Sequence, residues 1–260
     1  MLLRALYATL TALFVIATAS AEIPPLPEQM RVLLPVTVIN APGAFGSVWT
    51  SELRFFTPTG APLVYPLLVA GCEPACNEPI QAIPGTVFLA GFKRTEPGET
   101  GGSWLYVEKS AVDQTVVTLT LRENSHLFTQ IPTVRETEFF DDAVNIVAVP
   151  YNPDTRLTLR VYASEDFAGA TVRCRVREEF PDAAVSDEIV PLSVTQRYYQ
   201  TAYTFALRPA YGQLSWQPTT TTSTGRVRVE ITPLTPGLRY WAFISATDNT
   251  TQQTVILTTR

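Results

Sequence analysis

The sequence is most informative through the residues that it lacks. It has a single histidine, His126, and only two lysines, Lys93 and Lys109. A Ser-His-Asp or Cys-His site needs an imidazole to move the proton, and catalytic zinc usually takes two or three histidines. His126 follows Asn124 and Ser125 in a polar stretch, so we expect a solvated loop residue. The composition therefore argues against triad hydrolases and zinc enzymes.

The short motifs that signal nucleotide or acyl-transfer chemistry are also missing. The chain has no G-x-S-x-G, G-K-[ST] or G-x-G-x-x-G sequence, so we expect no bound cofactor. Its net charge is −5. Without the first 21 residues, 18 basic residues remain against 24 acidic ones. A mildly acidic surface is poorly suited to nucleic acid or to anionic lipid, so we expect neither as a partner.

The N-terminal 21 residues are typical of a secretory signal peptide. Arg4 supplies the positive charge, residues 5–17 are almost entirely apolar, and residues 19–21 give an A-x-A cleavage site. The apolar run is shorter than the roughly 20 residues of a spanning helix. No cysteine follows the cleavage site, which argues against a lipid anchor, and no later segment is apolar enough to span a bilayer. The sequence predicts a mature protein without a transmembrane segment that is secreted, periplasmic or held at the cell surface.

The three cysteines divide into a pair and a single residue. Cys72 and Cys76 bracket Glu-Pro-Ala in a turn-rich stretch, and an exported chain meets an oxidising compartment. We therefore predict a small-loop disulfide between them. A metal site is the alternative, but a lone C-x3-C does not complete a zinc site. Cys174 alternates with Val172 and Val176 on one face of a strand, which predicts a buried free thiol.

Short apolar runs with a period of two residues predict an all-β fold. Residues 226–231 alternate charged with β-branched side chains, and residues 117–121 alternate valine or leucine with threonine. Turn-forming residues separate such runs at regular spacing, and no amphipathic helix of three turns is present. This pattern is typical of antiparallel β-sandwiches.

The sequence also repeats itself loosely. Residues 53–56 read LRFF and residues 159–162 read LRVY, and each copy is followed by a polar turn and a second apolar run. Val-Glu at 107–108 and at 229–230 opens two further passages, which end in REN and TDN. We therefore predict two tandem antiparallel β-sandwich domains. The predicted parts are a signal peptide (1–21), an extended lead-in (22–29), a first domain (30–125), a linker (126–142) and a second domain (143–260).

The two repeated strands and the C-terminal RVRVEITPLTPGLRYWAFISATDN resemble bacterial exported proteins with tandem immunoglobulin-like or fibronectin-III-like domains. The closing stretch, 225–249, is similar to the last hairpin of uncharacterised secreted proteins of soil bacteria. The resemblance covers most of the mature chain and implies a β-sandwich fold and an extracytoplasmic role. It brings no catalytic residues. The chain departs from antibody domains because it lacks their Cys…Trp…Cys pattern.

Aromatic residues offer one candidate binding site. Sugar-binding β-sandwiches use flat rings as stacking platforms, and ring faces supply contact area at low entropic cost. Trp216, or the consecutive pair Tyr198 and Tyr199, is the candidate platform. We expect most other rings to be core, because both faces of a strand such as the one with Trp241 and Phe243 cannot be outside.

Acidic residues offer two further candidates. Calcium takes several oxygen ligands, and Asp141, Asp142 and Asp154 are weak candidates because no EF-hand loop is present. Glycoside hydrolysis needs only two carboxyl groups at a suitable separation. The acids that could supply them are Glu136, Glu138, Asp141, Asp142, Glu178 and Glu179. All of them lie in charged clusters, which are usually solvated surface.

These patterns favour a secreted, non-enzymatic protein that acts as a binding or structural module at the cell envelope. Its partner would be an envelope protein or a polysaccharide, contacted through loops or edge strands. The alternative is a carbohydrate-binding or carbohydrate-active β-sandwich protein that uses the aromatic platform or an acidic pair.

Overall fold

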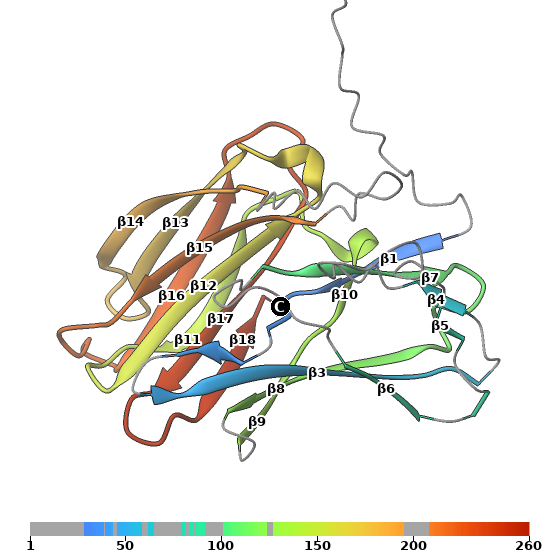
Figure 1. Cartoon of the computed structure of the whole chain (residues 1–260). Helices are drawn as coiled ribbons and strands as arrows, with labels where there is room; N and C mark the ends of the chain where they lie inside the picture. Colours follow the sequence, from blue (N-terminus) through green and yellow to red (C-terminus); the bar gives the residue numbers. More distant parts are fainter. Residues whose placement is uncertain are drawn as a thin grey trace, which may run out of the picture.

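The computed structural model describes residues 29–38, 40–43, 46–58, 62–64, 80–81, 84–85, 87–91, 101–123, 127–194 and 208–259. These residues form four antiparallel sheets (Figure 1). The all-β prediction is therefore confirmed for the part of the chain that the structure describes. The predicted signal peptide, 1–21, lies outside the described residues.

The strands up to Arg135, which we call the first half, form two of the four sheets. One has the order β10-β1-β7-β4-β5. Its strands are β1 (Gln29–Leu34), β4 (Pro62–Val64), β5 (Ile80–Gln81), β7 (Ser103–Glu108) and β10 (Val134–Arg135). The other has the order β2-β3-β8-β9, with β6 also paired to β3. Its strands are β2 (Ala41–Pro42), β3 (Val48–Phe56), β6 (Val87–Gly91), β8 (Val116–Glu123) and β9 (Leu127–Ile131).

The strands from Val144 onward, the second half, form the other two sheets. One has the order β11-β16-β13-β14. Its strands are β11 (Val144–Pro150), β13 (Thr171–Glu178), β14 (Ala184–Pro191) and β16 (Arg226–Pro233). The other has the order β15-β12-β17-β18. Its strands are β12 (Thr155–Ala163), β15 (Ala210–Trp216), β17 (Tyr240–Asp248) and β18 (Thr254–Thr258).

The two halves share one strand order. The run β1-β7-β4-β5 matches β11-β16-β13-β14, and β6-β3-β8-β9 matches β15-β12-β17-β18. The sequence echoes fall at matching places: residues 53–56 lie in β3 and 159–162 in β12, while 107–108 lie in β7 and 229–230 in β16. The loose sequence repeat thus marks a repeat of strand order.

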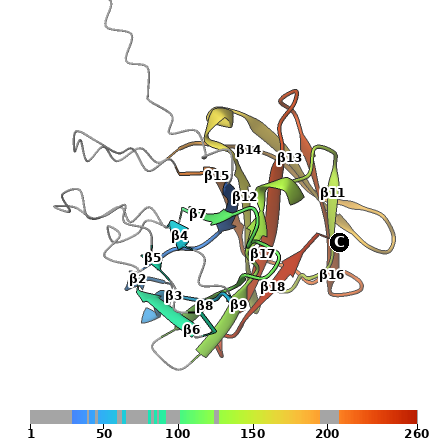
Figure 2. The ribbon, with the colours of Figure 1, turned by 90° about the vertical axis from the view of Figure 1, so that its right-hand side faces the viewer.

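The predicted linker, 126–142, is partly sheet. Its strands β9 and β10 pair with β8 and β1, so they complete the sheets of the first half. The short 3-10 helix η3 (Glu136–Glu138) then leads toward the second half. The halves also touch at their edges. Figure 2 shows β9 beside β18, where the Thr129 hydroxyl donates a hydrogen bond of 3.1 Å to the carbonyl of Thr254.

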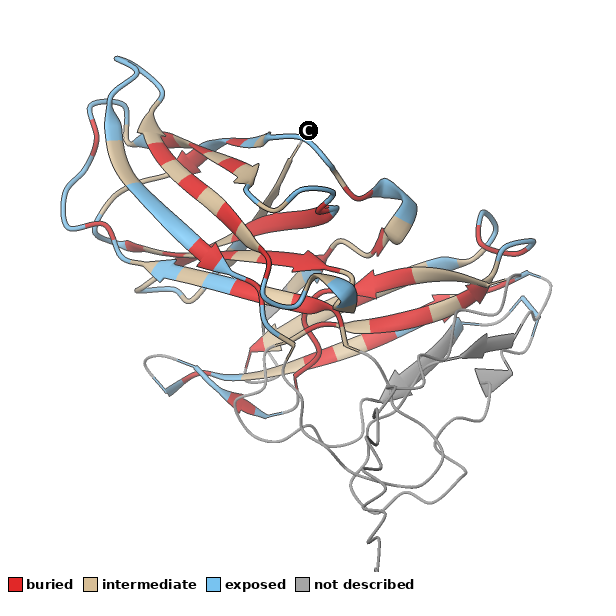
Figure 3. Ribbon diagram, turned by 90° about the horizontal axis from the view of Figure 1, so that it is seen from above, coloured by how far each residue is buried: buried red, intermediate tan, exposed pale blue. Residues whose placement is uncertain are grey.

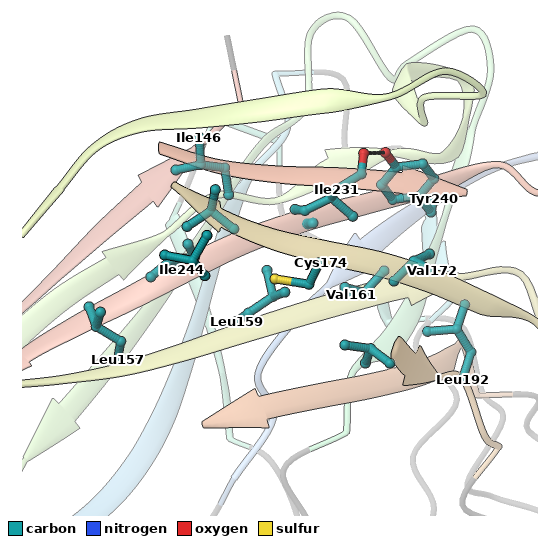
Figure 4. Packing of buried hydrophobic residues seen from close by; sticks show 14 of the residues in the cluster. Ile146, Leu157, Leu159, Val161, Val172, Cys174, Leu192, Ile231, Tyr240 and Ile244 are labelled. Carbon is teal, nitrogen blue, oxygen red and sulfur yellow. Dashed lines mark hydrogen bonds between the residues drawn. The ribbon is translucent and has the colours of Figure 1, made fainter. Parts of the chain in front are cut away.

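Alternation along β3, β12, β13 and β16 buries one face of each of these strands (Figure 3). In β13, Val172, Cys174 and Val176 are buried, whereas the arginines between them are partly exposed. Cys174 lies among aliphatic side chains that include Ile231 of the paired strand β16 and Leu159 of β12 in the other sheet (Figure 4). The thiol is free and fully buried, as the alternation predicted.

The buried core of the first half extends into the second. This cluster contains Tyr162, Trp241 and Phe243, which lie on the outer face of the β15-β12-β17-β18 sheet. Tyr162 is fully buried; its ring lies parallel to that of Phe243, with centroids 6.3 Å apart. Its hydroxyl donates a hydrogen bond to the carbonyl of Pro35 in the first half. One end of this outer face is therefore an internal surface, covered by the other half of the chain.

A glycine permits the close approach at this junction. A Cβ at Gly102 would lie 3.0 Å from Cε1 of Tyr162 and 3.0 Å from the carbonyl oxygen of Leu34. Both distances are shorter than ordinary van der Waals contact. Any larger residue would therefore require Tyr162 or the backbone at Leu34 to shift.

Burial makes a prediction for Cys174. Because desolvation raises the pKa of this thiol to about 12, very little thiolate forms between pH 7 and 9, and reagents cannot reach it in the folded protein. Iodoacetamide should leave the Cys174 peptide unlabelled in buffer and label it fully in denaturant, as mass spectrometry of the digest can show. Rapid labelling in the native protein would contradict the burial.

The junction makes a prediction for Tyr162. Tyr162→Ala should lower the free energy of unfolding by about 3–5 kcal/mol, since it removes a large buried ring. Tyr162→Phe should cost about 1–3 kcal/mol, because the carbonyl of Pro35 loses its donor. Denaturant titration followed by tryptophan fluorescence measures both. Tyr211→Phe, whose hydroxyl donates to the exposed side chain of Gln213, is the control, and an equal loss there would contradict the assignment.

Candidate functional site

Only one residue of the predicted aromatic platform lies in the described part of the chain. Tyr198 and Tyr199 lie outside it. Trp216 is on the inner face of β15, opposite Leu157, and packs against the buried cluster of the second half. Its indole N–H is buried and has no hydrogen-bond partner among the described residues. A stacking platform must present an open ring face, and Trp216 is partly buried where it packs against this cluster. A platform at Trp216 therefore stays a prediction.

Other sequence candidates fall on residues that the structure does not describe. Cys72 and Cys76, the predicted disulfide, lie outside the described residues, and so does His126. The disulfide therefore stays a prediction.

The three calcium candidates are not brought together. Asp141 and Asp142 are exposed just before β11. There the Tyr240 hydroxyl donates a hydrogen bond of 2.9 Å to the backbone carbonyl of Asp142. Asp154 is in the β11–β12 turn, where its carbonyl accepts a hydrogen bond of 2.9 Å from the N–H of Asn249. Tyr240 and Asn249 flank β17, so they are separated by roughly 30 Å of extended strand. Among the described residues, no three acidic, histidine or cysteine side chains gather as metal ligands.

The acids considered for glycoside hydrolysis are split between two places. Four of them lie between β10 and β11, and two lie at the end of β13. Several already serve as structural acceptors: Glu138 caps the N–H of Arg135 at 3.1 Å, and Glu179 accepts from the N–H of Ala148 at 2.6 Å. Glu178 accepts the hydroxyl of Ser223 at 3.0 Å. These contacts give the acids a role in fixing turns and bulges.

Charged side chains are most concentrated on the outer face of the β11-β16-β13-β14 sheet. Because alternation buries the valines and the cysteine of β13, it turns the arginines of that strand outward. The neighbouring strand β16 and the β13–β14 hairpin add one arginine and three acids. We call this set the arginine face: Arg173, Arg175, Arg177, Arg228, Glu230, Asp182 and Asp187.

At the centre of this face, Arg173 and Arg175 share one carboxylate. Arg173 holds Asp187 with two contacts, Nε–Oδ1 at 2.7 Å and Nη2–Oδ2 at 2.5 Å. Arg175 lies between Asp187 at 3.6 Å and Glu230 at 3.4 Å, its cross-strand partners on β14 and β16. The hydrogen bonds from Arg173 lower the pKa of Asp187, so this carboxylate stays an anion.

At the end of the face, two arginines share a second carboxylate. Arg177 and Arg228 lie directly opposite one another on β13 and β16, and like charges in that position repel. Asp182 relieves the repulsion, with Oδ1 2.7 Å from Nε of Arg177 and 3.3 Å from Nη2 of Arg228. The hydrogen bond from Arg177 lowers the pKa of Asp182. The whole face has four guanidinium groups and three carboxylates, so one positive charge remains.

Exposed apolar side chains flank the arginine face. Phe180, in the β13–β14 hairpin, is 77% exposed, and Ile189, the cross-strand partner of Arg173, is 63% exposed. Lone apolar residues are common on surfaces. Beside an array of arginines, however, an exposed phenylalanine and isoleucine reproduce the composition of protein–protein interfaces, where arginine and aromatic residues supply most of the binding energy.

A second charged cluster is buried between the halves. Arg31 of β1 contacts Glu136 through Nε at 2.7 Å and Glu165 of the 3-10 helix η4 (Glu165–Phe167) through Nη1 at 2.5 Å. Its guanidinium lies 4.8 Å from the ring centre of Trp104, whose indole donates to Glu165 at 3.2 Å. Burial alone would lower the pKa of Arg31, but the two carboxylates raise it above its ordinary value.

This buried cluster is structural. The side chains of Arg31 and Glu165 are only 10% and 8% exposed, so a ligand cannot reach them. The cluster joins strand β1 to η3 and η4 and thus fixes the first half against the second.

The arginine face follows from the sequence pattern of two strands, although motif and composition do not point to it. Residues 172–177 alternate valine or cysteine with arginine, and 226–231 do the same with arginine and glutamate. That pattern identified the buried face of each strand. The same alternation also predicts a row of charges on the opposite face.

Arg31 gives a testable prediction. Arg31→Met leaves the buried carboxylate of Glu165 without a counter-ion, and we expect the free energy of unfolding to fall by about 3–5 kcal/mol. The double variant Arg31→Met/Glu165→Met should recover much of that loss, since it removes the unpaired charge. Thermal and denaturant unfolding measure both. If the double variant is no more stable than the single one, the pair is not coupled.

Comparison with known proteins gives no relative. No family model matches the chain, and no curated protein or solved structure is significantly similar to it. Within the described residues, no helix combines the length and the apolar character that a membrane span needs.

Proposed function

We propose that this chain is an extracytoplasmic, non-enzymatic binding module whose partner docks on the arginine face. The observation that carries the proposal is the row of outward guanidinium groups, part of whose charge is not neutralised by carboxylates, beside exposed Phe180 and Ile189. The predicted signal peptide supports the compartment. The structural use of Glu138, Glu178 and Glu179 supports binding rather than hydrolysis.

The partner that fits this surface is an acidic patch of an envelope protein. A guanidinium group presents its donors in a planar fork that matches a carboxylate with two hydrogen bonds. Successive outward arginines of β13 are about 7 Å apart along the strand, so one partner can meet several of them. Ile189 favours a protein over a polysaccharide, because an aliphatic side chain gains from contact with apolar groups rather than from stacking on sugars.

We also propose that the chain comprises two tandem β-sandwich domains. The repeated strand order supports this proposal, and strands β9 and β10 extend the first unit to Arg135. When eight matched strands are counted along each half, the sheets have the orders 1-6-3-4 and 5-2-7-8. An immunoglobulin constant domain has ABED and CFG. The units would therefore resemble immunoglobulin domains in architecture but not in strand order.

The arginine face is tested by capture from envelope extract. Mature protein, residues 22–260, is immobilised, and the bound material is identified and its affinity measured. Arg173→Gln/Arg175→Gln should weaken binding by about tenfold or more and reduce its salt dependence, since two charged hydrogen-bonding groups are lost. The control, Arg135→Gln/Arg156→Gln, removes the same charge from other surfaces and should bind like the wild type.

Three outcomes would count against the proposal. Equal binding by the two double variants would remove the arginine face as the site. Capture of a polysaccharide through this face would replace the protein partner with a sugar polymer. Cleavage of any captured polymer by the pure protein would make the chain an enzyme.

A further inference from the structure

The repeated strand order lets the two halves be compared position by position. In the second half, Tyr162 is opposite Tyr211 of β15 and Trp241 of β17 on the outer face of the sheet. These rings contact one another, with centroids 5.2 Å apart for Tyr162 and Tyr211 and 6.4 Å apart for Tyr162 and Trp241. The first half covers them, and Tyr162 and Trp241 are 0% and 4% exposed.

The first half has an apolar surface at the matching position. The LRFF and LRVY strands align Phe56 with Tyr162. Phe56 is opposite Val87 of β6 and Val116 of β8, just as Tyr162 is opposite residues of β15 and β17. Val87 is 67% exposed and Val116 is 58% exposed. We call these three residues the open apolar face.

The surface that covers Tyr162 also has a counterpart. It is the end of the first half where Leu34 pairs with Ser103, preceded by Gly102. In the second half, Pro150 pairs with Arg226, which is preceded by Gly225.

No other part of the described chain presses on this second end. The N–H of Tyr151 donates a hydrogen bond of 2.8 Å to the carbonyl of Gly225, which is the last backbone contact between β11 and β16. A Cβ at Gly225 would meet only Thr221, at 3.9 Å, whereas one at Gly102 would clash with the docked Tyr162. The end of the second half thus keeps a matching glycine with nothing pressed against it.

The net charges near the two open surfaces have opposite signs. Arg54, two residues from Phe56 on the same face of β3, is 54% exposed, and it shares the carboxylate of Glu52 with Arg122 of the neighbouring strand, so one positive charge remains. At the other open surface, Glu178, which binds Ser223, and Glu179, which holds the nearby bulge at Ala148, outnumber the exposed Arg226. Opposite charges favour contact between the two surfaces and help to orient them.

We propose that copies of this chain associate head to tail. The end of the second half of one copy, around Tyr151 and Gly225, docks on the open apolar face of the next, and so continues between molecules the junction that already exists within each one. Such a contact uses two different surfaces, so each copy can bind two others, and it builds open chains, or rings where the rotation between copies closes. The second-half surface of this contact adjoins the Arg177 end of the arginine face, since Ser223 also donates to the carbonyl of Phe180 at 2.8 Å. The open apolar face lies in the other half of the chain, so a change at Val116 tests this contact without touching the arginine face.

Sedimentation velocity of mature protein, residues 22–260, tests the head-to-tail association. Protein concentrations from about 1 to 100 μM cover the dissociation constants of a contact of moderate affinity. The sedimentation coefficient should rise with concentration. Val116→Asp should shift that rise to about tenfold higher concentration or abolish it, because a charge is buried in the contact. Val255→Asp is the matched control: Val255 is also 58% exposed but lies on β18, and the variant should associate normally.

A second variant separates head-to-tail contact from a face-to-face dimer. Thr224→Arg places a bulky charge at the other end of the proposed contact and should also leave the protein monomeric by itself. Mixed in equal amounts, the two variants should form a dimer and nothing larger, because each contributes one intact surface. In a face-to-face dimer, Thr224→Arg would associate like the wild type, and the mixture would gain nothing.

Circular dichroism and thermal unfolding of each variant exclude misfolding as the cause. A wild type that stays monomeric over the whole range would overturn the proposal. If, in addition, Val116→Asp lowers the melting temperature of the monomer, the open apolar face is covered by the chain itself and not by a second copy.

Discussion

The packing of Tyr162 against the first half is the contact on which the arrangement of the molecule depends. It places a fully buried ring beneath Gly102 and directs its hydroxyl to the carbonyl of Pro35. The ion pair between Arg31 and Glu165 lies in the same junction, where burial makes each charge depend on the other. An apolar contact thus supplies the driving force, while the charged contact sets the geometry. The outer face of a sheet, which would ordinarily meet water, has become internal.

The same two-residue period produces both the core and the candidate binding surface. In β13 it sends Cys174 into a dry aliphatic cluster and Arg175 to the opposite face. The neighbouring strand β16 does likewise, so the same pattern on two paired strands holds guanidinium groups at fixed spacing. A surface carried by strands keeps its geometry better than one carried by loops, which suits recognition of a partner with several carboxylates.

Local pattern in the sequence predicted the fold class and the burial of Cys174, because alternation is decided within a strand. Local pattern could not predict what covers the outer face of the β15-β12-β17-β18 sheet. Tyr162 shares that face with half-exposed Arg160, and only the approach of the first half makes one buried and the other not. Nor could it place Asp154, which is close to Asp142 in sequence but lies at the far end of β11, in the connection to β12. An extended strand carries the chain about 3.4 Å per residue, so the two carboxylates end up far apart. Trp216 was ambiguous for the same reason as Tyr162: a strand has two faces, and composition alone does not say which is inside.

The mixed strand order has a consequence for how the molecule folds. In the second half, β12 pairs with β17 and β15, and β11 pairs with β16, so the early strands find their neighbours only among late ones. Apart from the β13–β14 and β17–β18 hairpins, little can form from local contacts. Such topologies fold slowly, since distant segments must meet before any pairing rewards them. During synthesis both edges of β12 stay unpaired until β15 and β17, in the last quarter of the chain, have been made. In that interval β12 can pair with strands of other chains.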